Sequence, residues 1–122
     1  MSAAQTDTTT IESRLARLRE QFMVRVITHL ATLDDLADRL DAAGTAADRE
    51  ESRWIAHSLA GAGGTFGFPV VSRHAGDLED YLATGPDNAA LAARLRTTVA
   101  AIRQDMAANM TSLGDQAEGS LP

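Results

Sequence analysis

His57 is the residue of this chain whose surroundings most clearly suggest chemistry. Arg53 precedes it by about one helical turn and Arg49 by about two, and the small residues Gly-Ala-Gly-Gly follow at positions 61–64. A histidine ring is a good nucleophile near neutral pH, and a phosphoryl group on a ring nitrogen is easily handed on. Arginine on the same face supplies positive charge that steadies such a group. These residue types allow phosphoryl chemistry at His57, but by themselves they do not name a function.

The periodicity of the surrounding segment places His57 away from a hydrophobic core. A helix is predicted from about Thr45 to Phe66, and Thr45 with Asp48 resembles a capping box at its start. The apolar stripe of this helix lies about 140–200° around its axis from the histidine. Four residues form the stripe: Ile55, Leu59, Ala62 and Phe66. His57 is therefore predicted to face solvent.

Three glycines follow the histidine at positions where a helix would normally continue. Gly61, Gly63 and Gly64 each cost about 0.5–1 kcal/mol relative to alanine in a helix interior. One interpretation is that the helix ends near Ala60 and that residues 61–67 form a loop. The other is that the helix continues, and that small side chains clear space beside the imidazole for a partner or a phosphoryl group. The apolar stripe persists to position 66 and favours the second interpretation.

Further helices are predicted over about residues 10–43, 69–83 and 88–108. The first of these is either one long helix or two helices that meet near Arg19–Gln21. Gly44 is predicted to cap its C-terminal end. Pro69 suits the first position of the next helix, and residues 84–87 are predicted to form a turn.

These elements predict an all-α fold, an antiparallel up-down four-helix bundle over residues 10–110, with or without an N-terminal helical extension. Residues 1–9 and 111–122 are polar and are predicted to be disordered ends. The apolar edge near Ile11–Leu18 could cap the bundle or pair with a second copy. A monomer and a weak homodimer therefore both remain open.

Composition limits the classes of function. The 122 residues suit one domain. The net charge of -6 argues against nucleic acid as a partner. There is no cysteine, no histidine pair with metal-ligand spacing and no apolar run long enough for a membrane span, so no metal, cofactor or membrane is expected. No signal peptide is recognisable, and the cytoplasm is the expected location.

The segment 57–67, His-Ser-Leu-Ala-Gly-Ala-Gly-Gly-Thr-Phe-Gly, resembles the signature of histidine-phosphotransfer (HPt) domains of two-component phosphorelays. That signature reads roughly His-x-Leu-Lys-Gly, then small residues, an apolar residue and a second glycine. Ala56 before the histidine and the pair Leu78-Glu79 also fit the family. The resemblance covers about residues 15–108 in helix order, and its specific part is 56–67 with 78–79. It implies a four-helix bundle with an exposed phosphorylated histidine.

By this resemblance His57 is the phosphoacceptor and Gly61 the glycine that opens the site. Ala60 departs from the pattern, because the family usually has there a lysine that helps to hold the phosphoryl group. All 11 basic residues are arginine, so Arg53 could supply the charge, with help from Arg49 or Arg73. The residues predicted to contact a partner are Arg49, Trp54, Gly64 and Arg73.

The resemblance implies in-line transfer of a phosphoryl group from a receiver-domain phosphoaspartate to a ring nitrogen, with Nε2 as the expected acceptor, and then onward to another receiver. The expected partners are response-regulator receiver domains and a hybrid histidine kinase. The metal ion and carboxylates of that chemistry belong to the receiver. The chain would be a phosphocarrier without kinase activity, because no ATP-binding glycine loop is present.

Two other interpretations stay open. The chain could be a helical docking or scaffold module that binds receiver domains or kinases without carrying phosphate, which Ala60 keeps possible. It could also be an unrelated four-helix protein whose glycine-rich helix packs tightly against a partner helix.

Overall fold

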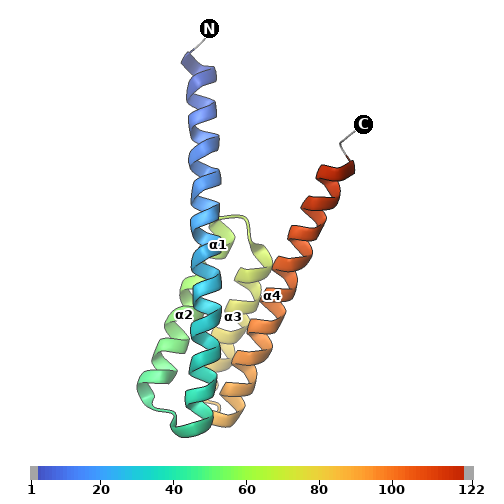
Figure 1. Cartoon of the computed structure of the whole chain (residues 1–122). Helices are drawn as coiled ribbons and strands as arrows, with labels where there is room; N and C mark the ends of the chain where they lie inside the picture. The colour runs from blue at the N-terminus through green and yellow to red at the C-terminus, as the bar shows by residue number, and fades with distance from the viewer. Residues whose placement is uncertain (1–2, 120–122) are drawn as a thin grey trace.

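The computed structural model describes the backbone of residues 3–119 and the side chains of residues 10–108. Its helices are α1 (Ala3–Ala43), α2 (Ala46–Thr65), α3 (Pro69–Ala83) and α4 (Asn88–Gly119). They run alternately down and up, and short turns join them (Figure 1). Within the described residues no strand is present. The predicted all-α four-helix bundle is confirmed.

The outer helices are longer than the sequence predicts. α1 is one continuous helix without a break at Arg19–Gln21; it begins at Ala3 instead of near Thr10, and α4 ends at Gly119 instead of near Ala108. No proline interrupts either segment, so nothing in the backbone forces an earlier end. Both ends project beyond α2 and α3 (Figure 1). The disorder predicted for 1–9 and 111–122 stays a prediction, and residues 1–2 and 120–122 lie outside the described residues.

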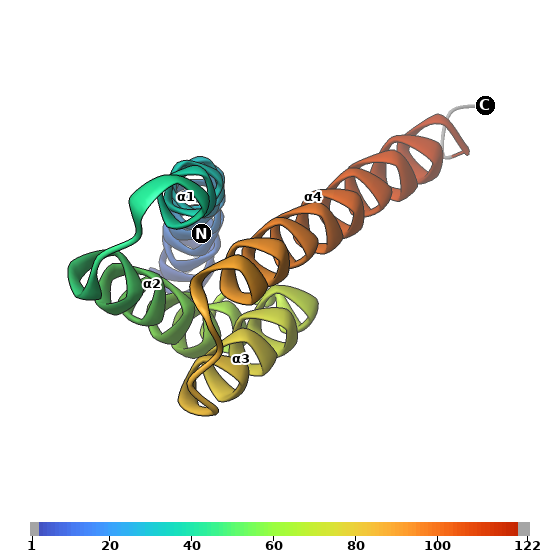
Figure 2. The same ribbon diagram turned by 90° about the horizontal axis from the view of Figure 1, so that it is seen from below.

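The core consists mainly of aliphatic side chains from all four helices, with few aromatic ones. α2 packs chiefly against α3, and α1 chiefly against α4 (Figure 2). Buried side chains include Phe22, Val26, Leu30, Leu33, Leu36, Leu40, Ile55, Leu59, Val71, Leu78, Leu91, Leu95, Val99 and Ile102. The ring of Phe22 lies 5.2 Å from that of Phe66 and 5.4 Å from that of Phe68, between centroids. These rings close the end of the bundle at the α2–α3 turn.

The apolar face of α1 is buried only from Phe22 onward. Ile11, Leu15 and Leu18 continue the same face toward the N-terminus but are exposed. The other bundle helices do not reach them, because α1 rises past the α2–α3 turn (Figure 1).

Gly44 follows the last residue of α1, as predicted, but not as a left-handed cap. Among the described residues a positive φ occurs only at Gly67 and Gly85. A Cβ atom on Gly44 would lie 2.7 Å from Leu40 Cδ2 and 2.8 Å from Asn88 Nδ2. A side chain at this position would therefore crowd Leu40 of α1 and Asn88 at the start of α4.

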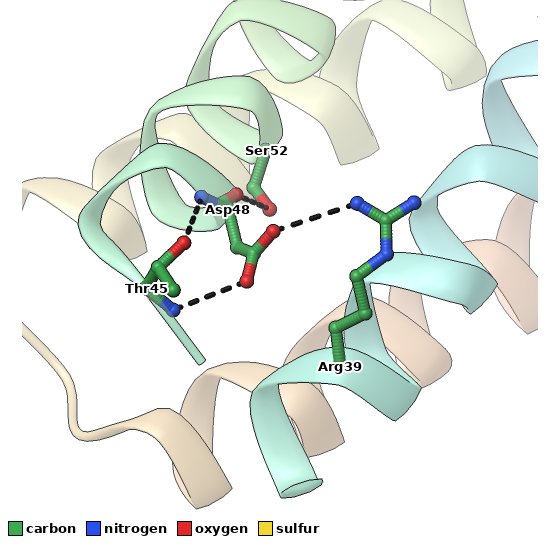
Figure 3. A network of polar contacts seen from close by, with 4 residues as sticks. All are labelled: Arg39, Thr45, Asp48 and Ser52. Carbon is green, nitrogen blue, oxygen red and sulfur yellow. Dashed lines mark hydrogen bonds and ion pairs between the residues drawn. The ribbon is translucent and has the colours of Figure 1, made fainter. Parts of the chain in front are cut away.

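The start of α2 is secured by the predicted capping box (Figure 3). The Thr45 hydroxyl accepts a hydrogen bond from the Asp48 amide at 3.2 Å, and the Asp48 carboxylate accepts one from the Thr45 amide at 3.1 Å. Arg39 of α1 reaches the same carboxylate at 3.5 Å. The backbone hydrogen bond from Thr45 is the main cause that lowers the pKa of Asp48. This network sets the position of α2 relative to α1.

Candidate functional site

His57 lies in the middle of α2 with its side chain 76% exposed. Its Nδ1 is 2.8 Å from Oε2 of Glu79, which reaches across from α3. A carboxylate only accepts hydrogen bonds, so Nδ1 carries a proton, and in the neutral ring the lone pair is on Nε2. The predicted exposure of His57 is confirmed. Glu79 had no predicted role; the only sequence signal for it was the Leu78-Glu79 pair.

A shallow pocket of about 240 Å³ surrounds the imidazole. Its lining residues are Glu50, Arg53, Trp54, His57 and Glu79. Arg53 is the single cation among them, and its guanidinium lies 3.0 Å from Oε1 of Glu50. This hydrogen bond raises the pKa of Arg53, to which the charge of Glu79 adds, and lowers the pKa of Glu50. The structure thus brings Arg53 and Trp54 to His57, as predicted, together with two carboxylates that were not predicted there.

The helix continues through the glycines to Thr65, so the interpretation that it ends near Ala60 is wrong. The three glycines differ in their surroundings. A Cβ atom on Gly61 would meet nothing within 4 Å, and one on Gly64 would touch only Ser72 Oγ, at 3.9 Å. A Cβ atom on Gly63 would lie 2.9 Å from the backbone nitrogen of Ser72. Gly61 and Gly64 therefore leave open surface, whereas Gly63 permits close packing of α2 on α3.

The buried face of α2 is rotated slightly from the predicted stripe. Ile55 and Leu59 are buried as predicted, but Ala62 and Phe66 are only partly buried. Ala56 and Gly63 are buried in their place, because α2 packs mainly on α3 rather than over the centre of the stripe. The rotation leaves His57 exposed.

Ala60 is half-buried and packs against the core on the α3 side of α2. Its carbonyl oxygen accepts a hydrogen bond of 2.5 Å from the Ser72 hydroxyl of α3. Together with the tight contact of Gly63, this bond holds the two helices in register behind the imidazole. Glu79, on the same helix as Ser72, is thereby kept opposite His57.

Two of the predicted arginines lie away from the pocket. Arg49 donates to Asn88 Oδ1 at 2.9 Å and to the carbonyl oxygen of Pro86, so it ties α2 to the α3–α4 turn. A helical wheel places Arg49 near the face of His57, but the turn offers its guanidinium two acceptors nearby. Arg73 is exposed on α3 and is not among the residues that line the pocket.

Trp54 is 61% exposed beside His57. Its ring packs in a T-shaped arrangement with the ring of His29 from α1, with the centroids 5.8 Å apart. Burial is the main cause that lowers the pKa of His29. Tryptophan is enriched among the residues that contribute most to binding at protein interfaces.

No group of three or more His, Cys, Asp or Glu side chains in the described part of the chain is arranged to hold a metal ion. Within residues 3–119, none of the helices combines the length and apolar character needed to cross a membrane.

Comparison with known families agrees with this arrangement. The family model of the Hpt domain matches residues 17–105, which include α2, α3, parts of α1 and α4, and the residues of the pocket. No curated protein and no solved structure matches the chain.

Proposed function

The chain belongs to the Hpt domain family, and from that premise we propose that His57 accepts a phosphoryl group from a receiver-domain phosphoaspartate and relays it to another receiver domain. Hpt domains act in phosphorelays as carriers, not as catalytic domains, and interact with receiver domains and histidine kinases. The observation that carries the proposal is the His57–Glu79 hydrogen bond of 2.8 Å on a ring that is 76% exposed.

This hydrogen bond supports Nε2 as the nucleophile. Glu79 accepts the Nδ1 proton, which orients the ring and leaves the Nε2 lone pair for attack. As the bond from Nε2 to phosphorus forms, the bond from phosphorus to the aspartyl oxygen of the receiver breaks, and the carboxylate leaves. The ring gains positive charge, which the Glu79 carboxylate stabilises. Attack by a second aspartate reverses these steps.

Arg53 is the residue we propose to hold the phosphoryl group in place of the family's lysine. It lies one turn before His57 and lines the same pocket, whereas Ala60 carries no charge. To bind the new oxygens it has to exchange its contact with Glu50. The side chains of Arg53 and Glu50 are 60% and 68% exposed, so that contact is weak and easily replaced.

Phosphoryl transfer from a labelled receiver domain tests the proposal. Wild-type protein should take up label that is stable in base and lost in acid, as expected of a phosphoramidate. His57→Gln should take up none, whereas His74→Gln, the control on α3, should be labelled normally. Label on the His57→Gln variant, or no label on wild type from its cognate receivers, would refute the proposal.

Arg53→Ala tests how the phosphate is held. Its matched control is Arg103→Ala, because Arg103 is also exposed and also pairs with one carboxylate, Asp34, at 2.8 Å. Arg53→Ala should slow transfer without changing the unfolding transition, and Arg103→Ala should not slow it. Equal transfer rates in both variants would show that Arg53 does not hold the phosphoryl group.

The second candidate function is docking of a receiver without phosphate transfer. The uncharged Ala60 and the two carboxylates of the pocket favour it. A titration of receiver domain followed by Trp54 fluorescence distinguishes the two functions. Binding together with failure to label wild type would establish docking, whereas labelling of His57 excludes docking as the whole function.

A further inference from the structure

His29 of α1 and Trp54 of α2 form an aromatic contact at the rim of the His57 pocket. The two rings are T-shaped to one another, with an interplanar angle of 77° and their centroids 5.8 Å apart. Aromatic rings prefer this geometry. Trp54 is exposed and lines the pocket, whereas His29 is half-buried and does not line it. The indole is therefore held from α1 while most of its surface stays open to a partner.

Contacts on both sides of His29 fix its place relative to α2. Near the start of α2, Arg39 of α1 lies 3.5 Å from the Asp48 carboxylate. At the other end of α2, the ring of Phe22 packs against that of Phe66, with the centroids 5.2 Å apart. α1 cannot slide or turn against α2 without breaking these contacts. His29 therefore meets the indole at a fixed position.

The His29 ring meets the indole as a neutral group. Burial lowers the pKa of His29 below its ordinary value of 6.5, and the positive charge of Arg25, one turn earlier on α1, lowers this pKa further. Near pH 7.5 the imidazole is thus uncharged, and its contact with Trp54 is one between two neutral aromatic rings. A phenylalanine at position 29 can replace such a contact, whereas an aliphatic or amide side chain cannot.

A receiver domain that transfers a phosphoryl group to His57 has to cover Trp54. The phosphorus atom must come within bonding distance of Nε2, and Trp54 lies three residues before His57 and lines the same pocket. The indole then lies near the centre of the interface, where binding energy is concentrated. A side chain that is already fixed before docking loses less conformational freedom on binding than one that rotates freely.

A different neighbouring helix thus orients each exposed ring of the pocket. Glu79 of α3 holds His57, and His29 of α1 holds Trp54. We propose that His29 is a positioning residue of the receiver-docking surface, which fixes the Trp54 indole beside His57 and so strengthens receiver binding. The identity of the partner rests on the proposed function.

Trp54 is the only tryptophan of the chain, so its fluorescence reports the contact directly. In time-resolved anisotropy, the wild-type indole should rotate with the whole domain. His29→Ala and His29→Gln should each add a fast component, and His29→Phe should keep the wild-type decay. Arg94→Ala is the matched control, because it removes another aromatic contact between two helices, that of Arg94 with Tyr81 at 5.0 Å, outside the pocket. The same decay in wild type and His29→Ala would overturn the proposal.

Receiver binding, measured by isothermal titration calorimetry, tests the consequence for docking. The probe is the unphosphorylated receiver domain that binds the wild type most tightly. Trp54→Ala should weaken binding at least about 30-fold, as expected of a central anchor. His29→Ala should weaken it about 3- to 10-fold, which corresponds to the cost of fixing one side chain. His29→Phe and Arg94→Ala should bind like the wild type, and thermal unfolding checks that all variants are folded. An unchanged affinity in His29→Ala, or an equal loss in His29→Phe, would contradict the positioning role.

Transfer rates measured against receiver concentration separate this proposal from the proposed function. His29→Ala should raise the concentration of phosphorylated receiver that gives half the maximal rate and leave the maximal rate unchanged, because the ring acts on docking and not on the chemistry. Receiver binding that depends on His29, without any label on His57, would refute the proposed function alone. Label on His57 with unchanged binding in His29→Ala would refute the positioning role alone.

Discussion

Substitution of Gly61 by alanine should make the protein more stable and less active. Gly61 lies inside α2, is exposed, and a Cβ atom there would meet nothing within 4 Å. Alanine is favoured over glycine in a helix interior by about 0.5–1 kcal/mol, and no steric cost offsets this gain. The free energy of unfolding should rise by that amount, which for a domain of this size raises Tm by about 2–5 °C.

Gly63→Ala is the matched control within the same helix. A Cβ atom on Gly63 would lie 2.9 Å from the backbone nitrogen of Ser72 and 3.1 Å from the carbonyl oxygen of Phe68. Backbone atoms cannot turn aside as a side chain can, and overpacking of this kind costs about 1–3 kcal/mol. After the gain in helix propensity, the net loss of stability in this variant should be up to about 2.5 kcal/mol. Urea unfolding followed by circular dichroism measures both variants.

The expected loss of phosphoryl transfer in Gly61→Ala follows from the position of Gly61, one turn beyond His57 on the exposed face of α2. A methyl group there stands in the way of an approaching receiver, so transfer to His57 should slow although the fold is stronger. Loss of stability in Gly61→Ala would refute the argument from open space. A stability gain with an unchanged transfer rate would show that access does not require glycine at this position.

Three further predictions concern charge. Glu50→Gln frees Arg53 from its ion pair, so phosphorylated His57 should lose its label more slowly, as followed by the decay of radiolabel. Asp48→Asn should remove a part of the stability that depends on pH. Because the pKa of Asp48 is lowered in the folded state, its ionised carboxylate stabilises the fold at pH values above its ordinary pKa of 3.8, and this stabilisation is lost as the pH falls through the folded-state pKa. Urea unfolding between pH 7 and 2 measures the difference. Burial lowers the pKa of His29 below 6.5, so protonation of its ring favours the unfolded chain, and the free energy of unfolding falls as the pH drops below 6.5. His29→Gln should make the free energy of unfolding less dependent on pH between pH 8 and 5.

The local features of the fold could be predicted from the sequence because they depend on neighbouring residues. The capping box of Thr45 and Asp48 and the placement of Pro69 at a helix start need only a few residues of context. The exposure of His57 follows from the helical period alone, since any residue opposite an apolar stripe faces outward. The buried face of α2 is rotated from the predicted stripe, but His57 is exposed all the same.

Features that depend on contacts between helices could not be predicted in the same way. Glu79 meets His57 because Ser72 and Gly63 set the register of α3 against α2, and no pattern within α2 contains that register. The difference between Gly61 and Gly63 has the same origin. Arg49 is drawn to the α3–α4 turn because the turn returns to the start of α2, which is visible only once the helices are packed.

The charge around His57 connects the missing lysine with the proposed function. The pocket holds one guanidinium, that of Arg53, against the carboxylates of Glu50 and Glu79. A phosphoryl group adds roughly two negative charges, and Ala60 contributes no cation to offset them. On the proposed function, such a site binds the group loosely and gives it up readily to the next aspartate. Weak retention suits a carrier between two receivers, because a group held tightly by the donor histidine would be slow to leave.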